Sequence, residues 1–97
     1  MKCIIVDDDK LSCKILEGYV NKFSTLDLAG IFNDPISARN AIAKDKDIEL
    51  VFLDIKMPEM DGFDFIGSLD TPPNIIIVSG NEEFALRAFD FNVVDFL

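Results

Sequence analysis

The segment LVFLDIKMPEMDG, residues 50–62, places a single carboxylate directly after a run of four apolar residues. Residues 50–53 have the pattern of a strand that is buried on both faces, and Asp54 follows them without a turn residue. A lone charge at the edge of a core is destabilising by several kcal/mol unless a neighbouring group compensates for it. We therefore expect other functional groups beside Asp54.

Composition restricts the class of protein. The 97 residues are enough for one domain with a single core, and the longest apolar run is too short to span a bilayer. The start, MKCIIVDDDK, lacks the features of a signal peptide. The net charge of -9 argues against direct binding of nucleic acid, and the absence of histidine removes the commonest general base and metal ligand. Cys3 and Cys13 fall in a strand pattern and a helix pattern, which favours buried thiols in a reducing cytoplasm.

Strand and helix patterns alternate along the chain. Helix patterns follow Lys10, the cap pair Asp34-Pro35 (running to about Lys44) and Asn81, and a short one covers residues 62–69. The strand patterns between them occupy residues 3–7, 26–32, 49–54, 74–79 and 93–97. This alternation predicts an α/β fold, a doubly wound parallel sheet of five strands with helices on both faces.

The first helix pattern carries a long apolar stripe. Its members recur at steps of four residues and are widened by two more apolar positions: Leu11, Ile15, Tyr19 and Phe23, with Leu16 and Val20. This spacing is typical of an amphipathic helix.

The expected topology brings acidic residues to one edge of the sheet. Sites in open parallel sheets form at the carboxyl ends of strands, near the point where strand order reverses. Asp7 and Asp8 follow the first strand pattern, Asp54 ends the third, and Ser79 ends the fourth. Converging carboxylates repel one another unless a cation lies between them, and oxygen ligands without His or Cys favour Mg²⁺. The alternative is that the acids only complement a helix dipole, which we prefer for Asp9 and leave open for Asp7 and Asp8 taken alone.

These segments resemble a known family. IIVDDD, FLDIKMPEMDG, IIIVSGNEE and FNVVDFL, in this order and spacing, resemble the receiver domain of two-component response regulators. The resemblance covers nearly the whole chain, and D-x-x-M-P-x-M-D-G is its most specific motif. It implies a flavodoxin-like sheet of strand order 2-1-3-4-5 and phosphorylation in the cytoplasm by a histidine kinase or phosphotransfer protein. The ending FALRAFDFNVVDFL further resembles receivers that are joined to a LytTR-type DNA-binding output domain.

The resemblance also implies roles for individual residues. Asp54 matches the phosphoryl acceptor. Asp8 and Asp54 match the side-chain ligands of Mg²⁺, together with the backbone carbonyl of Lys56, and Asp7 would act through a metal-bound water. The Lys56 side chain itself either reaches the phosphoryl group or is a solvated loop lysine.

Two further residues match the switch of the family. Ser79 matches the hydroxyl that follows the phosphoryl group, and Phe96 matches the aromatic residue that moves into the space left behind. Ser79 and the backbone N–H of Gly80 would contact the phosphoryl group, although a plain strand-to-helix turn is the alternative there. Such a two-state switch would change the face formed by the fourth helix and fifth strand.

The sequence departs from the family pattern at its end. The family has a lysine followed by a proline at the end of the fifth strand, and then one more helix that packs beside the first. Here no lysine follows Lys56, so we expect residues 1–97 to form a receiver domain that is incomplete at its C-terminus. If nothing follows, a bare sheet face would drive a dimer or larger assembly. We expect that face to include Val51, Leu53, Ile75, Ile77 and part of residues 93–97.

Two other classes of protein stay open. An aspartate-nucleophile phosphatase also ends a parallel strand in an acid, but it needs a general acid two residues later, where this chain has Lys56. A pseudo-receiver that docks partners without phosphorylation agrees with the absent lysine but not with the intact acidic residues. We therefore predict a phosphoacceptor signalling domain, not an enzyme, with self-catalysed phosphoryl transfer at most.

Overall fold

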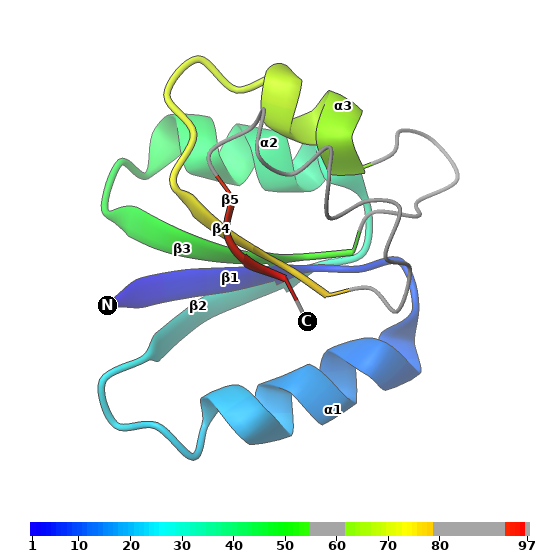
Figure 1. The fold of residues 1–97 in the computed structure, drawn as a ribbon, viewed down its shortest axis with the longest axis vertical. Helices are drawn as coiled ribbons and strands as arrows, with labels where there is room; N and C mark the ends of the chain where they lie inside the picture. Colours follow the sequence, from blue (N-terminus) through cyan, green and yellow to red (C-terminus); the bar gives the residue numbers. More distant parts are fainter. Residues whose placement is uncertain (55–61, 79–92, 97) are drawn as a thin grey trace.

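The computed structural model describes residues 1–54, 62–78 and 93–96, which form a parallel sheet between two layers of helix (Figure 1). The strand order is β2-β1-β3-β4-β5, and every neighbouring pair is parallel, as the doubly wound prediction required. In chain order the elements are β1 (Lys2–Val6), α1 (Lys10–Val20), β2 (Asp27–Phe32), α2 (Pro35–Lys44), β3 (Ile48–Leu53), α3 (Gly62–Gly67), β4 (Asn74–Ile77) and β5 (Val93–Phe96). The helix predicted after Asn81 lies outside the described residues.

The sheet separates two apolar clusters because side chains of a strand alternate between its faces. In Figure 1, α1 covers one face, and α2 and α3 cover the other. On the α1 face, Cys3 and Ile5 of β1 pack with Leu50 and Phe52 of β3. The cluster on the opposite face joins both strands to the two other helices; its buried members are Ile4, Val6, Ala38, Ile42, Ile48, Val51, Leu53, Phe65, Ile66, Ile75 and Ile77.

Side-chain caps explain where the two long helices begin. The Asp9 side chain accepts a hydrogen bond of 3.0 Å from Leu11 N, and Asp34 accepts one of 2.8 Å from Ser37 N. Each bond satisfies an amide that has no partner within its own helix. Pro35 occupies the start of α2, where its missing N–H is not needed. The cap pair at α2 is therefore confirmed, and Asp9 lies at a helix N-terminus, as the dipole interpretation expected, where it also acts as the cap.

The apolar stripe of α1 does not face the sheet. Three of the four predicted members lie on α1 and are largely exposed: Leu11 67%, Ile15 55% and Tyr19 58%. The fourth, Phe23, follows the end of the helix at Val20 and is 57% exposed. The contact with the sheet comes instead from buried Cys13 and Val20, with Leu16 packed against them. The amphipathic helix is present, but the regular stripe in the sequence is not its buried face.

The expectation of a bare sheet face was wrong for the four residues of β3 and β4, whereas the side chains of residues 93–97 lie outside the described ones. Val51, Leu53, Ile75 and Ile77 have 0% exposure, because α2 and α3 lie over them. On β4, the half-buried residue is Ile76, which points to the α1 face, and Val78 just beyond the strand is half-buried on the same side. The expectation from the sequence placed the four side chains with 0% exposure on the α1 face of the sheet, whereas they lie on the opposite face. A shift of one residue in the alternation of a strand has this effect.

Within the described ranges, no helix is long and apolar enough to cross a membrane.

Candidate metal centre at the carboxyl edge of the sheet

Three carboxylates meet where β1 and β3 end. Asp7, Asp8 and Asp54 each offer an oxygen, and these oxygens lie within 4.8 Å of one another. Asp7 is buried, with 4% exposure, while Asp54 is half-buried and Asp8 is exposed. The cluster therefore runs from the edge of the core to solvent, which is a suitable arrangement for an ion that keeps some of its water.

Sheet register brings these residues together. Val6 pairs with Phe32 of β2 on one side and with Leu53 of β3 on the other, so the three strands end at the same level. The ladder continues one residue further, because Asp7 N donates to Phe32 O at 3.0 Å and Asp54 N donates to Val6 O at 2.9 Å. The central place of β1, between β2 and β3, is what puts Asp7 and Asp54 side by side.

The fourth strand ends beside the same cluster. Val78 N donates a hydrogen bond of 2.9 Å to Leu53 O, which places Val78 next to Asp54. The predicted functional residues Ser79 and Gly80, like Lys56, lie outside the described residues. Phe96 belongs to β5, but its side chain is outside them too.

Burial is the main influence on Asp7. Removal from water raises the pKa of the Asp7 carboxyl group, and the negative charges of Asp8 and Asp9 add to that effect. The Asp9 N–H, which donates to Asp7 Oδ1 at 2.9 Å, and a hydrogen bond with Asp54 lower the pKa in part. The cluster thus concentrates negative charge that a cation would neutralise.

A hollow of about 400 Å³ opens beside Asp7 and Asp54. One wall is acidic, and the other is formed by the apolar side chains of α1, namely Ile15, Leu16 and Tyr19. Sequence reasoning found the acids but missed this apolar wall, because it treated the α1 stripe only as a sign of an amphipathic helix.

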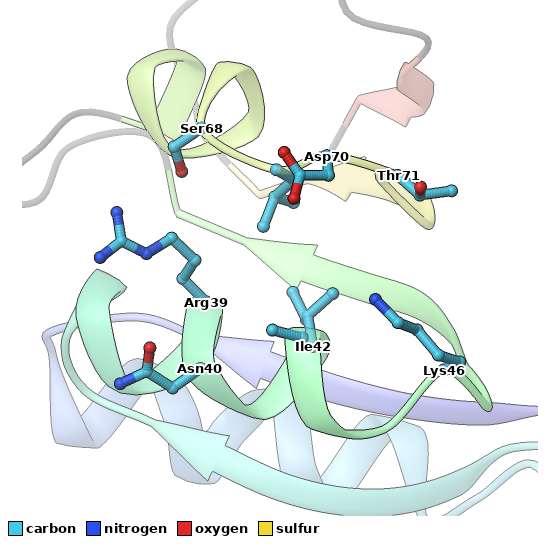
Figure 2. Close-up of a pocket in the computed structure, with 9 residues that line it drawn as sticks. Arg39, Asn40, Ile42, Lys46, Ser68, Asp70 and Thr71 are labelled. Carbon is cyan, nitrogen blue, oxygen red and sulfur yellow. The ribbon is translucent and has the colours of Figure 1, made fainter.

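A second hollow, of about 290 Å³, lies between α2 and the segment after α3 (Figure 2). Arg39 and Lys46 approach it from α2 and its C-terminal end, and Asp70 lies above Ile42 between them. None of the three clustered acids lines this hollow. Its mixed charges do not form a set of metal ligands.

Both cysteines are free and buried, as their positions in the sequence predicted. Burial raises the pKa of each thiol, so both keep their proton at neutral pH. Sequence reasoning did not foresee that Cys13 Sγ lies 3.3 Å from the Asp7 carbonyl oxygen, or that Asn33 Nδ2 lies 2.9 Å from the same oxygen. The one available signal was that Asn33 directly follows β2, the strand beside β1.

Comparison with known proteins identifies the family. The profile described as "Response regulator receiver domain" matches residues 3–97. The chain therefore belongs to the response regulator receiver domain family, and the resemblance drawn from its motifs is confirmed. It is a receiver domain with a cluster of Asp7, Asp8 and Asp54, and receiver domains are the phosphoacceptor modules of two-component signalling.

Individual relatives agree with this assignment. An uncharacterized response regulatory protein of Shewanella oneidensis is 37% identical over 97 residues, covering 98% of this chain and 41% of that protein. The transcriptional regulatory protein BtsR of Escherichia coli K12 is 29% identical over 99 residues, covering 100% of this chain and 41% of BtsR. The chain thus spans about two fifths of these curated relatives.

A solved structure shows the same fold. The response regulator domain of Thermotoga maritima CheB superimposes with a TM-score of 0.88 at 18% identity, covering 100% of this chain and 76% of that one. At this identity the likeness shows the fold alone.

Proposed function

We propose that Asp54 accepts a phosphoryl group from a histidine kinase or phosphotransfer protein, with Mg²⁺ bound beside it. The observation that carries this proposal is the convergence of Asp7, Asp8 and Asp54 oxygens within 4.8 Å at the carboxyl edge of a receiver domain. Asp54 follows β3 directly and is half-buried, which supports it as the nucleophile that a partner can reach.

The donor set fits Mg²⁺. All three side chains offer hard oxygen ligands, and burial of Asp7 makes uncompensated charge unfavourable there. Asp8 and Asp54 would hold the ion together with the backbone carbonyl of Lys56, and Asp7 would orient a bound water. When bound, the ion would neutralise charge on the phosphoryl oxygens during transfer.

The step itself is a displacement at phosphorus. A carboxylate oxygen of Asp54 forms a bond to phosphorus as the bond from phosphorus to the donor nitrogen breaks, and that nitrogen keeps the electron pair. Because a carboxylate is a weak nucleophile, the rate depends on how Asp54 is positioned and on charge neutralisation around it. Ser79 and the Gly80 N–H would then contact the new phosphoryl group.

The switch would follow from that contact. Ser79 moves toward the phosphoryl group, Phe96 fills the space it leaves, and the face of the fourth helix and β5 changes. The output is carried by a partner or by a further domain of LytTR type that binds DNA. Support for transcription comes from BtsR, a relative that is itself named a transcriptional regulatory protein. The net charge of -9 makes this domain unsuited to contact nucleic acid directly, and the proposed location is the cytoplasm.

Phosphate uptake tests the proposal. The 97-residue chain and the full product of its gene are incubated with acetyl phosphate, with and without Mg²⁺, and intact mass is measured. We expect one added phosphoryl group that requires Mg²⁺ and is absent in Asp54→Ala. Asp70→Ala removes an acid from the second hollow and should label like the parent. Labelling of Asp54→Ala equal to the parent would exclude Asp54 as acceptor, and a full-length protein that takes up no phosphate would favour the pseudo-receiver.

A further inference from the structure

The peptide bond between Asp7 and Asp8 is held by two side chains outside the acidic cluster. Asn33 Nδ2 donates a hydrogen bond of 2.9 Å to the Asp7 carbonyl oxygen, and the Cys13 thiol donates another at 3.3 Å. Asn33 Nδ2 also lies 3.4 Å from Cys13 Sγ, so the two donors contact each other. Both acceptor positions of this one carbonyl are thus occupied by side chains from different parts of the fold.

The held peptide matters because it connects two of the clustered acids. A peptide unit is planar, so a turn of its carbonyl also turns the following N–H and changes ψ of Asp7 and φ of Asp8. On the Asp7 side the chain is also tied to β2 through the bond from Asp7 N to Phe32 O. With the Asp7 side tied in this way, a change in φ of Asp8 would redirect the Asp8 side chain and alter the spacing of the three carboxylates.

We infer that Asn33 and Cys13 are positioning residues for the divalent cation, and that they set the angle between the Asp7 and Asp8 carboxylates. This inference rests on the metal site proposed above. Neither side chain is a ligand in that site; each acts through the Asp7 carbonyl. Groups that orient metal ligands in this way typically change metal affinity by about 10–100-fold when they are removed.

The two residues contribute unequally. The Asn33 amide is the stronger donor and has the shorter bond, whereas a thiol is a weak donor. Asn33 is also exposed, so its removal leaves the core intact, whereas Cys13 has 3% exposure and belongs to the α1-side cluster. Asn33 is therefore the cleaner site for a test that separates positioning from folding.

The first experiment titrates MgCl₂ into the parent, Asn33→Ala and Asn40→Ala, followed by amide NMR shifts. Asn40 is an exposed residue of α2 whose side-chain amide makes no hydrogen bond to the described residues, which makes it a matched control. We expect the Kd for Mg²⁺ to rise about tenfold in Asn33→Ala and to stay unchanged in Asn40→Ala. The Asp8 amide resonance should also move in metal-free Asn33→Ala, because that N–H belongs to the released peptide.

A kinetic measurement separates positioning from a general structural role. In acetyl phosphate labelling, Asn33→Ala should need about ten times more Mg²⁺ for half-maximal rate, yet approach the parent rate at saturating Mg²⁺. Its metal-free melting temperature should stay close to that of the parent. A Kd within twofold of the parent would overturn the role of Asn33, and so would a reduced rate that saturating Mg²⁺ does not restore.

Variants of Cys13 test the second donor. Cys13→Ser keeps a proton donor and should keep the parent affinity for Mg²⁺, whereas Cys13→Ala should bind more weakly. If the two variants bind Mg²⁺ with equal affinity, Cys13 is not a positioning residue. If either variant fails to fold, the role of Asn33 is still decided by the Asn33→Ala measurements.

The inference and the proposed metal site can fail separately. A parent that binds Mg²⁺ while Asn33→Ala binds it equally well contradicts only this inference. A parent that binds none contradicts the proposed metal site and this inference with it.

Discussion

At the scale of single residues, the acidic cluster stores electrostatic repulsion. Asp7 has 4% exposure, and the charges of Asp8 and Asp9 add to burial in raising the pKa of its carboxyl group. Without a cation, the folded chain must hold these groups closer together than the unfolded chain does. Sites that bind ligands often carry such local destabilisation, and the binding of a cation relieves it.

The first residue-scale prediction is that Asp8→Ala raises the melting temperature in metal-free buffer by a few degrees. The same variant should lose most of the stabilisation that Mg²⁺ gives to the parent, since a proposed ligand is gone. Asp70→Ala removes an equal charge from an exposed position away from the cluster and serves as control. Thermal melts with EDTA and with MgCl₂ measure both effects. If Mg²⁺ stabilises Asp8→Ala as much as the parent, Asp8 is not a ligand.

At the scale of secondary-structure elements, the start of α2 depends on one carboxylate. Hydrogen bonds from Ser37, first of all its backbone N–H, hold the pKa of Asp34 below its usual value of 3.8. An acid with a lowered pKa in the folded state stabilises the fold above its unfolded pKa, and this contribution is lost as the pH falls through the folded pKa. The cap should therefore act at neutral pH and fade in acid.

The corresponding prediction compares Asp34→Ala with Asp34→Asn. Asparagine also caps helices but does not titrate, whereas alanine leaves the Ser37 amide without a partner. We expect Asp34→Ala to melt below the parent at pH 7, and we expect this difference to shrink as the pH falls below about 3.8. Asp34→Asn should stay near the parent at pH 7. Melts over a pH series measure this, and an Asp34→Ala deficit that is constant from pH 7 to pH 2.5 would contradict the role of the charged cap.

A second prediction at this scale distinguishes the two kinds of apolar position on the helices. Ile42 of α2 is 6% exposed and Ile15 of α1 is 55% exposed, so the same substitution probes a covered and an uncovered site. In the monomer, Ile42→Ala should lower the free energy of unfolding by about 2–5 kcal/mol, and Ile15→Ala by less than about 0.5 kcal/mol. Urea denaturation at a protein concentration too low for association measures both. A large loss in Ile15→Ala under these conditions would show that another part of the same chain covers the α1 stripe.

At the scale of the whole molecule, the exposed stripe of α1 is the main apolar surface among the described residues that has no cover. Leu11, Ile15, Tyr19 and Phe23 are each more than half exposed. An apolar hollow of about 320 Å³ adjoins them, lined by Leu16, Tyr19, Val20, Phe23, Leu26 and Phe52. Contiguous apolar surface of this kind normally marks a contact with another element or another chain.

We accordingly predict that residues 1–97, studied alone, associate into dimers or larger assemblies through the α1 face. The sequence predicted association through the sheet face that carries Val51 and Ile75, but α2 and α3 cover that face. The double variant Ile15→Ser/Tyr19→Ser should restore a monomer, whereas Ile36→Ser, at an exposed apolar residue of α2, should not. Light scattering at micromolar concentration gives the mass. A parent chain that is monomeric and melts cooperatively at high temperature would contradict the prediction.

Local chemistry determined much of this protein without any tertiary information. Asp9 and Asp34 cap helices because a short carboxylate reaches an amide two or three residues away. The alternation of strands and helices led to the parallel sheet, and the acids at strand ends led to the cluster at its carboxyl edge. These inferences depend on residues close in the chain and on rules of topology, so the sequence contains them.

Packing decided what local patterns could not. The stripe of α1 has the same period whether it faces the sheet or solvent, and only the position of the helix over Cys3, Ile5 and Phe52 selects Cys13 and Val20 as its inner side. A strand such as β3, apolar on both faces, likewise does not reveal which helix covers which residue. Asn33 reaches Asp7 across 26 positions of sequence, because β2 and β1 end side by side. Contacts of that kind depend on distances between elements, and these exist only once the chain has folded.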